Sequence, residues 1–229
     1  MTAATTAPAA AQDTHAHIDP AAQVADAGKT VPVQTRSERP HSFDPSDFGA
    51  PTGREVNWKH TPVDRLHALL TDAPGDELAV SIDLDGVEAL LVPDEDEAYG
   101  QFFRPEDLAS ALAWKHAPRG LHVRIEEGDE IAEPVVLRID GTDAGKRAFG
   151  QILIEAMPNA HATVVLDHHG SAQYAQNVEI IARDGSRLTV VTVQRWADDA
   201  IHVSSHQARV DKDAALTHFV VSFGGAVVR

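Results

Sequence analysis

The chain has 229 residues and 43% hydrophobic content, with no cysteine and a net charge of −16 from 35 acidic against 19 basic side chains. A chain without cysteine forms neither a disulfide framework nor a thiolate metal site, and a strongly negative chain repels the phosphate backbone of nucleic acid. The N-terminus has no basic n-region, and no run approaches the roughly 18 apolar residues that span a bilayer, so we predict a cytoplasmic protein with no membrane or nucleic-acid partner.

The first segment, residues 1–42, is predicted to be a disordered tail. It is rich in Ala, Thr and Pro, and the first aromatic residue of the chain is Phe43. Such a composition cannot bury enough apolar surface to offset the entropy cost of ordering the chain. His15 and His17 lie in this tail, and two imidazoles in a flexible segment make a poor metal site, so we expect them to be solvated.

A short amphipathic helix is predicted after Trp58, with Pro62 as its first residue and Val63, Leu66 and Leu70 at helical spacing. Thr61 is a suitable N-cap, Pro62 fits the first helical position because it lacks the N–H that would be unpaired there, and Asp64 completes a capping-box arrangement. Apolar residues then recur at helical spacing. Trp58, just before this helix, is expected to pack beneath it.

A β-hairpin is predicted to follow this helix. Apolar residues alternate on both sides of Asp85-Gly86, a pair that favours a tight turn, so residues 78–84 and 87–91 are expected to be paired strands. Together with the helices on either side, the hairpin would form a small α/β region over residues 43–119.

Two further features precede Gly120. The acidic run Asp94–Glu97 is expected to be a solvated loop, because no rigid framework surrounds it. A second helix is predicted after Pro105, with Leu108 and Leu112 among its apolar residues, and it should end before Pro118.

From Gly120 onward the sequence reads as strands, and two sets of strands recur regularly. The first set is marked by Pro134-Val-Val-Leu, Thr163-Val-Val-Leu, Thr189-Val-Val-Thr and Thr217-His-Phe-Val, with spacings of 29, 26 and 28 residues. The second set keeps step at Ile152, Val178 and His206, with spacings of 26 and 28. Turn-forming residues lie between the paired strands, at Pro158-Asn159, Asp184-Gly185 and Lys212-Asp213.

This repeat predicts a β-solenoid over residues 120–229, in which each coil buries its apolar side on the next. The alternative is a β-sandwich of antiparallel hairpins, for which Asp184-Gly185 would also be a suitable turn. Residues 216–229 read as an apolar strand, a double-glycine turn and the start of another strand. The solenoid therefore predicts an open apolar edge there, as in a β-helix cut between coils.

The segment Gly141–Arg147 is a weak candidate for a phosphate-binding loop. It has three residues between its glycines where the P-loop has four, and Arg147 follows Lys146 where Ser or Thr is needed. We expect instead a polar loop that links the first and second coils.

Candidate catalytic carboxylates do not gather in the repeat. An acid/base pair of a polysaccharide-cleaving solenoid should appear where neighbouring coils align. At an offset of 26, Glu155 aligns with Ile181 and Asp167 with Val193, so no carboxylate pair is predicted. No serine lies in a nucleophile-elbow sequence.

Thirteen histidines raise the question of a metal site. His168 and His169 are expected at a loop after a strand, and His202 and His206, four apart in an extended segment, should point to the same side. Without a carboxylate or thiolate companion at ligand spacing, these residues are predicted to be structural. No catalytic, cofactor-binding or metal-ligating residue is therefore predicted.

Two aromatic residues of the repeat have no predicted functional role. Trp196 and Phe219 are expected to lie in the core or to anchor loops, because nothing marks them as a stacking platform.

Several segments resemble the SufB/SufD family of the SUF iron–sulfur cluster assembly system. PTGREVNWKHTPVDRL, residues 51–66, is similar to the N-terminal signature of the SufD branch. The stretch at residues 107–139 resembles the helix and strand that lead into the family's β-helix. MPNAHATVVLDHHG, residues 157–170, and FVVSFGGAVVR, residues 219–229, resemble later coils. The similarity covers about residues 50–229.

This resemblance implies a mainly β fold, with a truncated right-handed parallel β-helix preceded by the small α/β region and the tail. It implies pairing with a SufB-like subunit through the β-helix. A C-terminal helical region, absent here, would dock a SufC-like ATPase, so the chain is expected to be the N-terminal portion of a longer protein.

The role implied is a non-catalytic scaffold subunit, not an enzyme. The full complex would handle an iron–sulfur cluster transiently, and this portion would bind no cofactor. The absence of cysteine agrees with that role, because clusters are normally held by thiolates. Two alternatives stay open: a fragment of a carbohydrate-active β-helix enzyme, and a region that binds iron or flavin directly.

Overall fold

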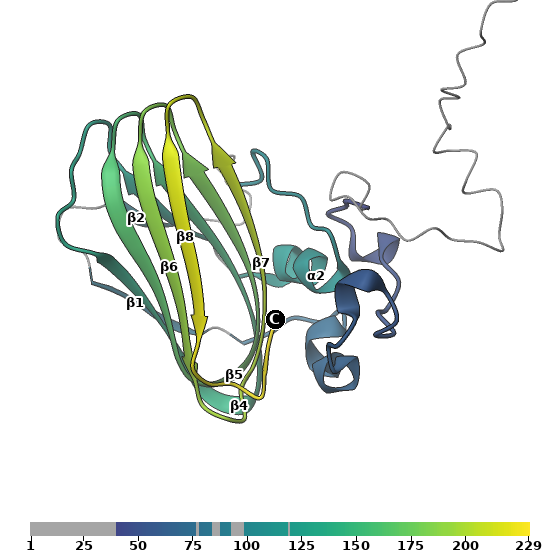
Figure 1. Cartoon of the computed structure of the whole chain (residues 1–229). Coiled ribbons are helices and arrows are strands. Elements are labelled where there is room, and N and C mark those ends of the chain that lie inside the picture. Colours follow the sequence, from purple (N-terminus) through teal and green to yellow (C-terminus); the bar gives the residue numbers. More distant parts are fainter. Residues whose placement is uncertain (1–39, 77, 84–87, 93–98, 119) are drawn as a thin grey trace, which may run out of the picture. The chain divides into compact units, whose positions relative to one another are not determined.

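The computed structural model of the chain describes residues 40–76, 78–83, 88–92, 99–118 and 120–229. Its strands lie side by side and run parallel from one coil to the next, as Figure 1 shows for β4, β5, β6 and β8. This arrangement confirms the predicted β-helix, and the antiparallel sandwich is wrong for the repeat. The predicted tail lies almost wholly outside the described residues, and the acidic run Asp94–Glu97 and the pair Asp85-Gly86 lie outside them entirely.

Each coil consists of two arms that are joined at corners. The first arms are residues 135–142 of β4 (Val135–Ala156), residues 161–170 of β5 (His161–Ala182), β6 (Arg187–Trp196) and β8 (Ala215–Ser222). The second arms are β3 (Gly120–Ile125), the later halves of β4 and β5, β7 (Ile201–Val210) and β9 (Val227–Val228). Both sets pair in parallel.

The register between coils confirms the predicted repeat. In the first arms Thr163 pairs with Thr189 and Thr189 with Thr217. In the second arms Ile152 pairs with Val178 and Val178 with His206. Residues of the same parity therefore face the lumen, which we define as the space between the two arms, in every coil.

The predicted turn residues form one stacked corner. Asn159, Gly185 and Asp213 have positive φ values of 60°, 71° and 58°, a conformation that Gly, Asn and Asp adopt at least cost. The N–H of Asn159 donates to the carbonyl of Asp184 at 2.9 Å, and the N–H of Gly185 donates to that of Lys212 at 2.9 Å. Each corner thus hydrogen-bonds to the next.

The segment Gly141–Arg147 does not link two coils. It lies within β4, where the pairing with β5 shifts register between Thr142 and Arg147, so it joins the two arms of a single coil. The predicted linking loop is therefore wrong in its position.

The predicted hairpin is also wrong, although both of its strands exist. β1 (Ala79–Asp83) pairs antiparallel with the first arm of β4, and β2 (Glu88–Val92) pairs antiparallel with β3. The two strands therefore do not pair with each other. Each instead hydrogen-bonds to the free edge of a different arm at the start of the coils, β1 to the first arm of β4 and β2 to β3.

The helices before the coils are short, at η2 (Pro45–Asp47), η3 (Val56–Trp58), η4 (Val63–Leu70) and α2 (Leu108–His116). The predicted helix η4 is present as a 3₁₀ helix, and its cap prediction is wrong. Pro62 is its N-cap, and no side-chain cap bond forms. The N–H of Thr61 donates to the carbonyl of Trp58 in the preceding turn. Trp58 is buried in one cluster with Leu66 and Leu69, which confirms its predicted packing.

The predicted second helix is confirmed as α2, and it packs on the coils (Figure 1). Asp107 caps it by accepting from the N–H of Ser110 at 2.9 Å. The hydroxyl of Ser110 in turn donates to Asn177 of β5 at 2.8 Å. The outer face of the second arms is therefore covered by the chain's own N-terminal region.

A buried carboxylate fastens the segment before α2 to the same face. The side chain of Glu179, 2% exposed, accepts from the N–H groups of Gly100, Phe102 and Phe103 at 2.8, 3.2 and 3.4 Å. Three donors on one carboxylate satisfy a group that would be costly to bury alone.

We predict that the lumen carries most of the stability. Leu166 is fully buried in the lumen, while its neighbour Val165 is half-buried on the outer face. Leu166→Ala should lower the free energy of unfolding by about 2–5 kcal/mol, because it leaves a cavity. Val165→Ala should cost less than about 1 kcal/mol. Urea denaturation midpoints measure both, and equal losses would contradict the assigned faces.

Candidate functional site on the outer face of the coils

The outer face of the first arms carries a continuous apolar row. Val136 pairs with Val165, Val165 with Val191 and Val191 with Phe219, so one apolar side chain from each coil lies in line. We call these four residues the apolar strip. They alternate with lumen-facing residues, and α2 and its neighbours cover the other arm.

The strip becomes more exposed toward the last strand. Val136, Val165 and Val191 are half-buried, whereas Phe219 is 55% exposed. Val221 and Phe223, further along, are 37% and 75% exposed. Contiguous exposed apolar surface of this kind marks an interaction site more often than isolated apolar residues do. The prediction that Phe219 lies in the core or anchors a loop is wrong, because it is exposed within β8, while Trp196 is buried in the core as predicted.

An open groove of about 400 Å³ lies beside the strip. Its lining combines the threonine pair of β5 and β6 with charged and apolar residues of the preceding loop: Glu130, Ile131, Ala132, His161, Ala162, Thr163, Arg187 and Thr189. The groove adds a polar border to the apolar strip, as is usual for protein interfaces.

A charged cluster borders the strip on its other side. Asp167 is 3% exposed and accepts from Nε of Arg195 at 3.0 Å, and its other oxygen lies 2.8 Å from Nε2 of His169. Burial acts to raise the pKa of Asp167, but the bonds from Arg195 and His169 outweigh it and hold that pKa below its usual value. The carboxylate is thus held ionised as an ion-pair partner.

A second buried carboxylate lies on the outer face of the second arms. Glu155 is 5% exposed, with Nε of Arg183 at 2.7 Å and Nε2 of His122 at 3.2 Å. Burial acts to raise the pKa of Glu155, but His122 and Arg183 lower it by more, so the net pKa shift is downward. In the strand register Glu155 pairs with Ile181 and Asp167 with Val193, as predicted, so neither carboxylate stacks on another.

The lumen changes character along the coils. It is aliphatic in the first coils, where Leu137, Ile154 and Ile180 are fully buried. Further along, buried polar side chains occupy it: His168, Gln176, Thr192, Gln194 and His202. Three of their atoms, Nε2 of Gln176, Oγ1 of Thr192 and Nε2 of His202, are buried without a hydrogen-bond partner.

His168 and His202 lie together in this polar part. The prediction that His168 and His169 lie at a loop is wrong, because both belong to β5. Their ring centroids are 4.8 Å apart, and Nδ1 of His202 accepts from the indole N–H of Trp196 at 3.2 Å. Burial lowers the pKa of His168 and places that of His202 well below its usual value. Both rings are therefore neutral at neutral pH.

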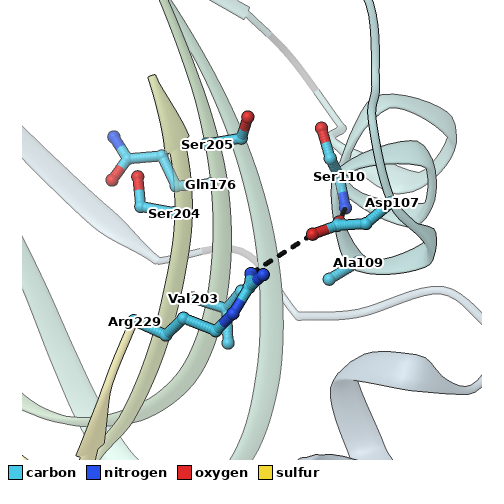
Figure 2. Close-up of a pocket in the computed structure, with 8 residues that line it drawn as sticks. All are labelled: Asp107, Ala109, Ser110, Gln176, Val203, Ser204, Ser205 and Arg229. Carbon is cyan, nitrogen blue, oxygen red and sulfur yellow. Dashed lines mark hydrogen bonds and ion pairs between the residues drawn. The ribbon is translucent and has the colours of Figure 1, made fainter. Parts of the chain in front are cut away.

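A small cavity separates α2 from β7, and its lining residues are drawn in Figure 2: Asp107, Ala109, Ser110, Gln176, Val203, Ser204, Ser205 and Arg229. Its volume of about 10 Å³ accommodates roughly one water molecule. Arg229 crosses it to pair with Asp107 at 3.2 Å, and its guanidinium lies 3.8 Å from the ring centroid of Trp58. These contacts are structural.

Two other kinds of site are absent from the described residues. No group of three or more His, Asp or Glu side chains in this part of the chain could hold a metal ion. None of its helices is long and apolar enough to cross a membrane.

The fold is a β-helix of parallel coils with one bare and one covered outer face. Residues 138–229 match the family model described as the SufBD core domain of SUF system FeS cluster assembly. From residue 138 onward the coils are therefore similar to the SufBD core domain.

Curated relatives extend this similarity to the region before the coils. The chain is 36% identical over 191 residues to an iron–sulfur cluster assembly SufBD family protein of Mycobacterium bovis, which covers 82% of this chain and 48% of the relative. A SufBD family protein of Mycobacterium leprae is 37% identical over 191 residues, covering 82% and 49%. The chain spans about half the length of these curated relatives.

Sequence reasoning did not identify the apolar strip or the polar lumen. The strip was visible in principle as the alternate residues of each repeat, since Val136, Val165 and Val191 occupy equivalent positions. The sequence alone does not show that α2 covers the outer face of the second arms.

We predict that the buried histidines make stability depend on pH. Because the pKa values of His168 and His202 are lower in the folded than in the unfolded chain, where they are about 6.5, the unfolded state gains protons first as the pH falls. Their contribution is full above about pH 6.5 and declines below it, by up to about 1.4 kcal/mol per pH unit for each ring.

His202→Gln should therefore reduce the loss of stability between pH 7 and pH 5. His67→Gln, at an exposed position of η4, is the matched control and should keep the wild-type slope. Urea denaturation at several pH values measures the slope. An unchanged slope in His202→Gln would contradict the neutral buried state.

Proposed function

We propose that this chain is a non-catalytic scaffold subunit of a SUF-type iron–sulfur cluster assembly complex in the cytoplasm. The observation that carries this proposal is the match of residues 138–229 to the SufBD core domain, supported by curated relatives that are themselves described as iron–sulfur cluster assembly proteins. The N-terminal signature around Trp58 favours a SufD-like role over a SufB-like one.

The outer face of the coils is the surface we assign to a SufB-like subunit. The apolar strip is half-buried to exposed, continuous across the coils and bordered by the Thr163–Thr189 groove and the Asp167 cluster. A partner that covers it gains the free energy of removing apolar surface from water. Contact with a SufC-like ATPase would be made elsewhere than on this face.

The geometry of the carboxylates supports a scaffold over a hydrolase. Asp167 and Glu155 are each neutralised by an arginine and lie on different arms. An acid/base pair needs one carboxyl group whose pKa is raised, whereas the pKa values of both are lowered. The proposed role also requires no thiolate-bound cluster in this cysteine-free chain.

We predict that the chain co-purifies with the SufB-type subunit of its own organism, and that the apolar strip carries the contact. Phe219→Asp combined with Val221→Asp should reduce the retained SufB-type subunit at least about tenfold, because charge replaces exposed apolar contacts. Tandem affinity purification from co-expressing cells measures this.

Val56→Asp is the control, since Val56 is 62% exposed on η3, outside the coils. It should leave the retained amount unchanged. Failure of the wild-type chain to retain the subunit would refute the proposed function. Retention by the Phe219→Asp, Val221→Asp variant would refute only the assigned surface.

A further inference from the structure

The buried carboxylate beside the apolar strip is shared by two arginines from different coils. Arg138 of β4 pairs in register with Asp167 of β5, and its Nη2 atom lies 3.9 Å from Oδ2 of that carboxylate. Arg195 of β6 ion-pairs with the same Oδ2 through Nη2, and its Nε donates to Oδ1 at 3.0 Å. Arg138 is therefore a further member of the Asp167 cluster, which also contains His169.

The Asp167 cluster carries more positive than negative charge. Two guanidinium groups, which are protonated at all relevant pH values, share one carboxylate, so one positive charge is left over even when His169 is neutral. Among the side chains that the structure describes, no second carboxylate ion-pairs with Arg138 or Arg195. The side chains of these two arginines are 54% and 51% exposed, so the excess charge faces solvent.

This charge lies on the outer face and not at an open strand edge. Arg138 belongs to β4 and Arg195 to β6, and β8 pairs with β6 on the side away from β5. Along the strands, Arg138 is two residues from Val136 of the apolar strip, and both side chains are on the outer face. An exposed arginine beside apolar surface is a frequent component of protein interfaces.

The charge of the cluster indicates the chemistry of the group that it would bind. A single excess positive charge matches one carboxylate, which a guanidinium binds through paired N–H donors. A polyanion such as nucleic acid would be repelled by the rest of the chain, whose net charge is −16. The groove on the other side of the strip is lined by both Glu130 and Arg187, so it does not select one sign in this way.

We propose that the Asp167 cluster binds a carboxylate of the partner subunit, supplied by an Asp or Glu side chain that lies beside the apolar strip and pairs with Arg138 and Arg195. Asp167 is the positioning residue, because it holds Arg195 through Nε and Nη2. An arginine already held in place loses less conformational entropy on binding. The inference rests on the proposed function, since it names the chemistry by which the assigned surface recognises a SufB-like subunit.

The first test measures how fast the SufB-type subunit of the same organism binds the immobilised full chain. At an ionic strength of about 0.01 M, Arg138→Glu should slow association about tenfold, because the partner's carboxylate is then repelled. At about 1 M, where the Debye length is about 3 Å, the difference should largely disappear. Arg54→Glu is the matched control, because it makes the same change in net charge at an exposed position before η3. It should leave the rate nearly unchanged.

The second test identifies the partner group by a covalent cross-link. Arg138→Lys keeps the positive charge and introduces an amine. A carbodiimide joins that amine to a carboxylate in contact with it, forming an amide while the carbodiimide takes up the released water as a urea. We expect an amide between position 138 and an Asp or Glu of the SufB-type subunit, located by mass spectrometry. Arg54→Lys should give no such link.

Circular dichroism establishes that each variant is folded, and if Arg138→Glu is not, the cross-link at position 138 decides alone. Failure of the wild-type chain to bind the SufB-type subunit would overturn the proposed function, and the inference with it. If the wild-type chain binds, three results would overturn the inference alone: equal rates for Arg138→Glu and Arg54→Glu, no cross-link from position 138 to the subunit, or a link from that position only to a second copy of this chain.

Discussion

The parallel, in-register stacking of the coils is the constraint on which the rest of the structure depends. Thr163, Thr189 and Thr217 align because the strands keep the same parity from coil to coil. A slip of one residue would exchange the lumen and the outer face of a whole arm. The stacked corners at Asn159, Gly185 and Asp213 hold this register through their own hydrogen bonds.

Given that register, the two arms have different outer environments. The second arms are covered by α2 and by the segment that Glu179 binds through three backbone N–H groups. The first arms keep Val165, Val191 and Phe219 on an uncovered face. The chain covers one face with its own N-terminal region and leaves the other uncovered, and this division is the structural support for the proposed scaffold role.

The lumen also divides, and its two parts have different physical consequences. Aliphatic packing around Leu166 and Ile180 supplies stability by burying apolar area. Around His202 the buried side chains are polar, and some of their atoms lack a hydrogen-bond partner, which lowers stability.

The sequence by itself determined the repeat and its turn residues, because the spacing of 26–29 residues and the alternation within each strand can be seen in the residue types alone. The repeat favoured a solenoid but left an antiparallel sandwich open, and the parallel β-helix was implied by the family resemblance and decided by the strand pairing. Only the tertiary structure decided that β1 and β2 pair with different arms, and that Phe219 is exposed while His168 is buried. Those outcomes depend on which strand edge is free and which face another element covers. Such contacts join residues far apart in the chain, such as Ser110 and Asn177, and no local pattern encodes them.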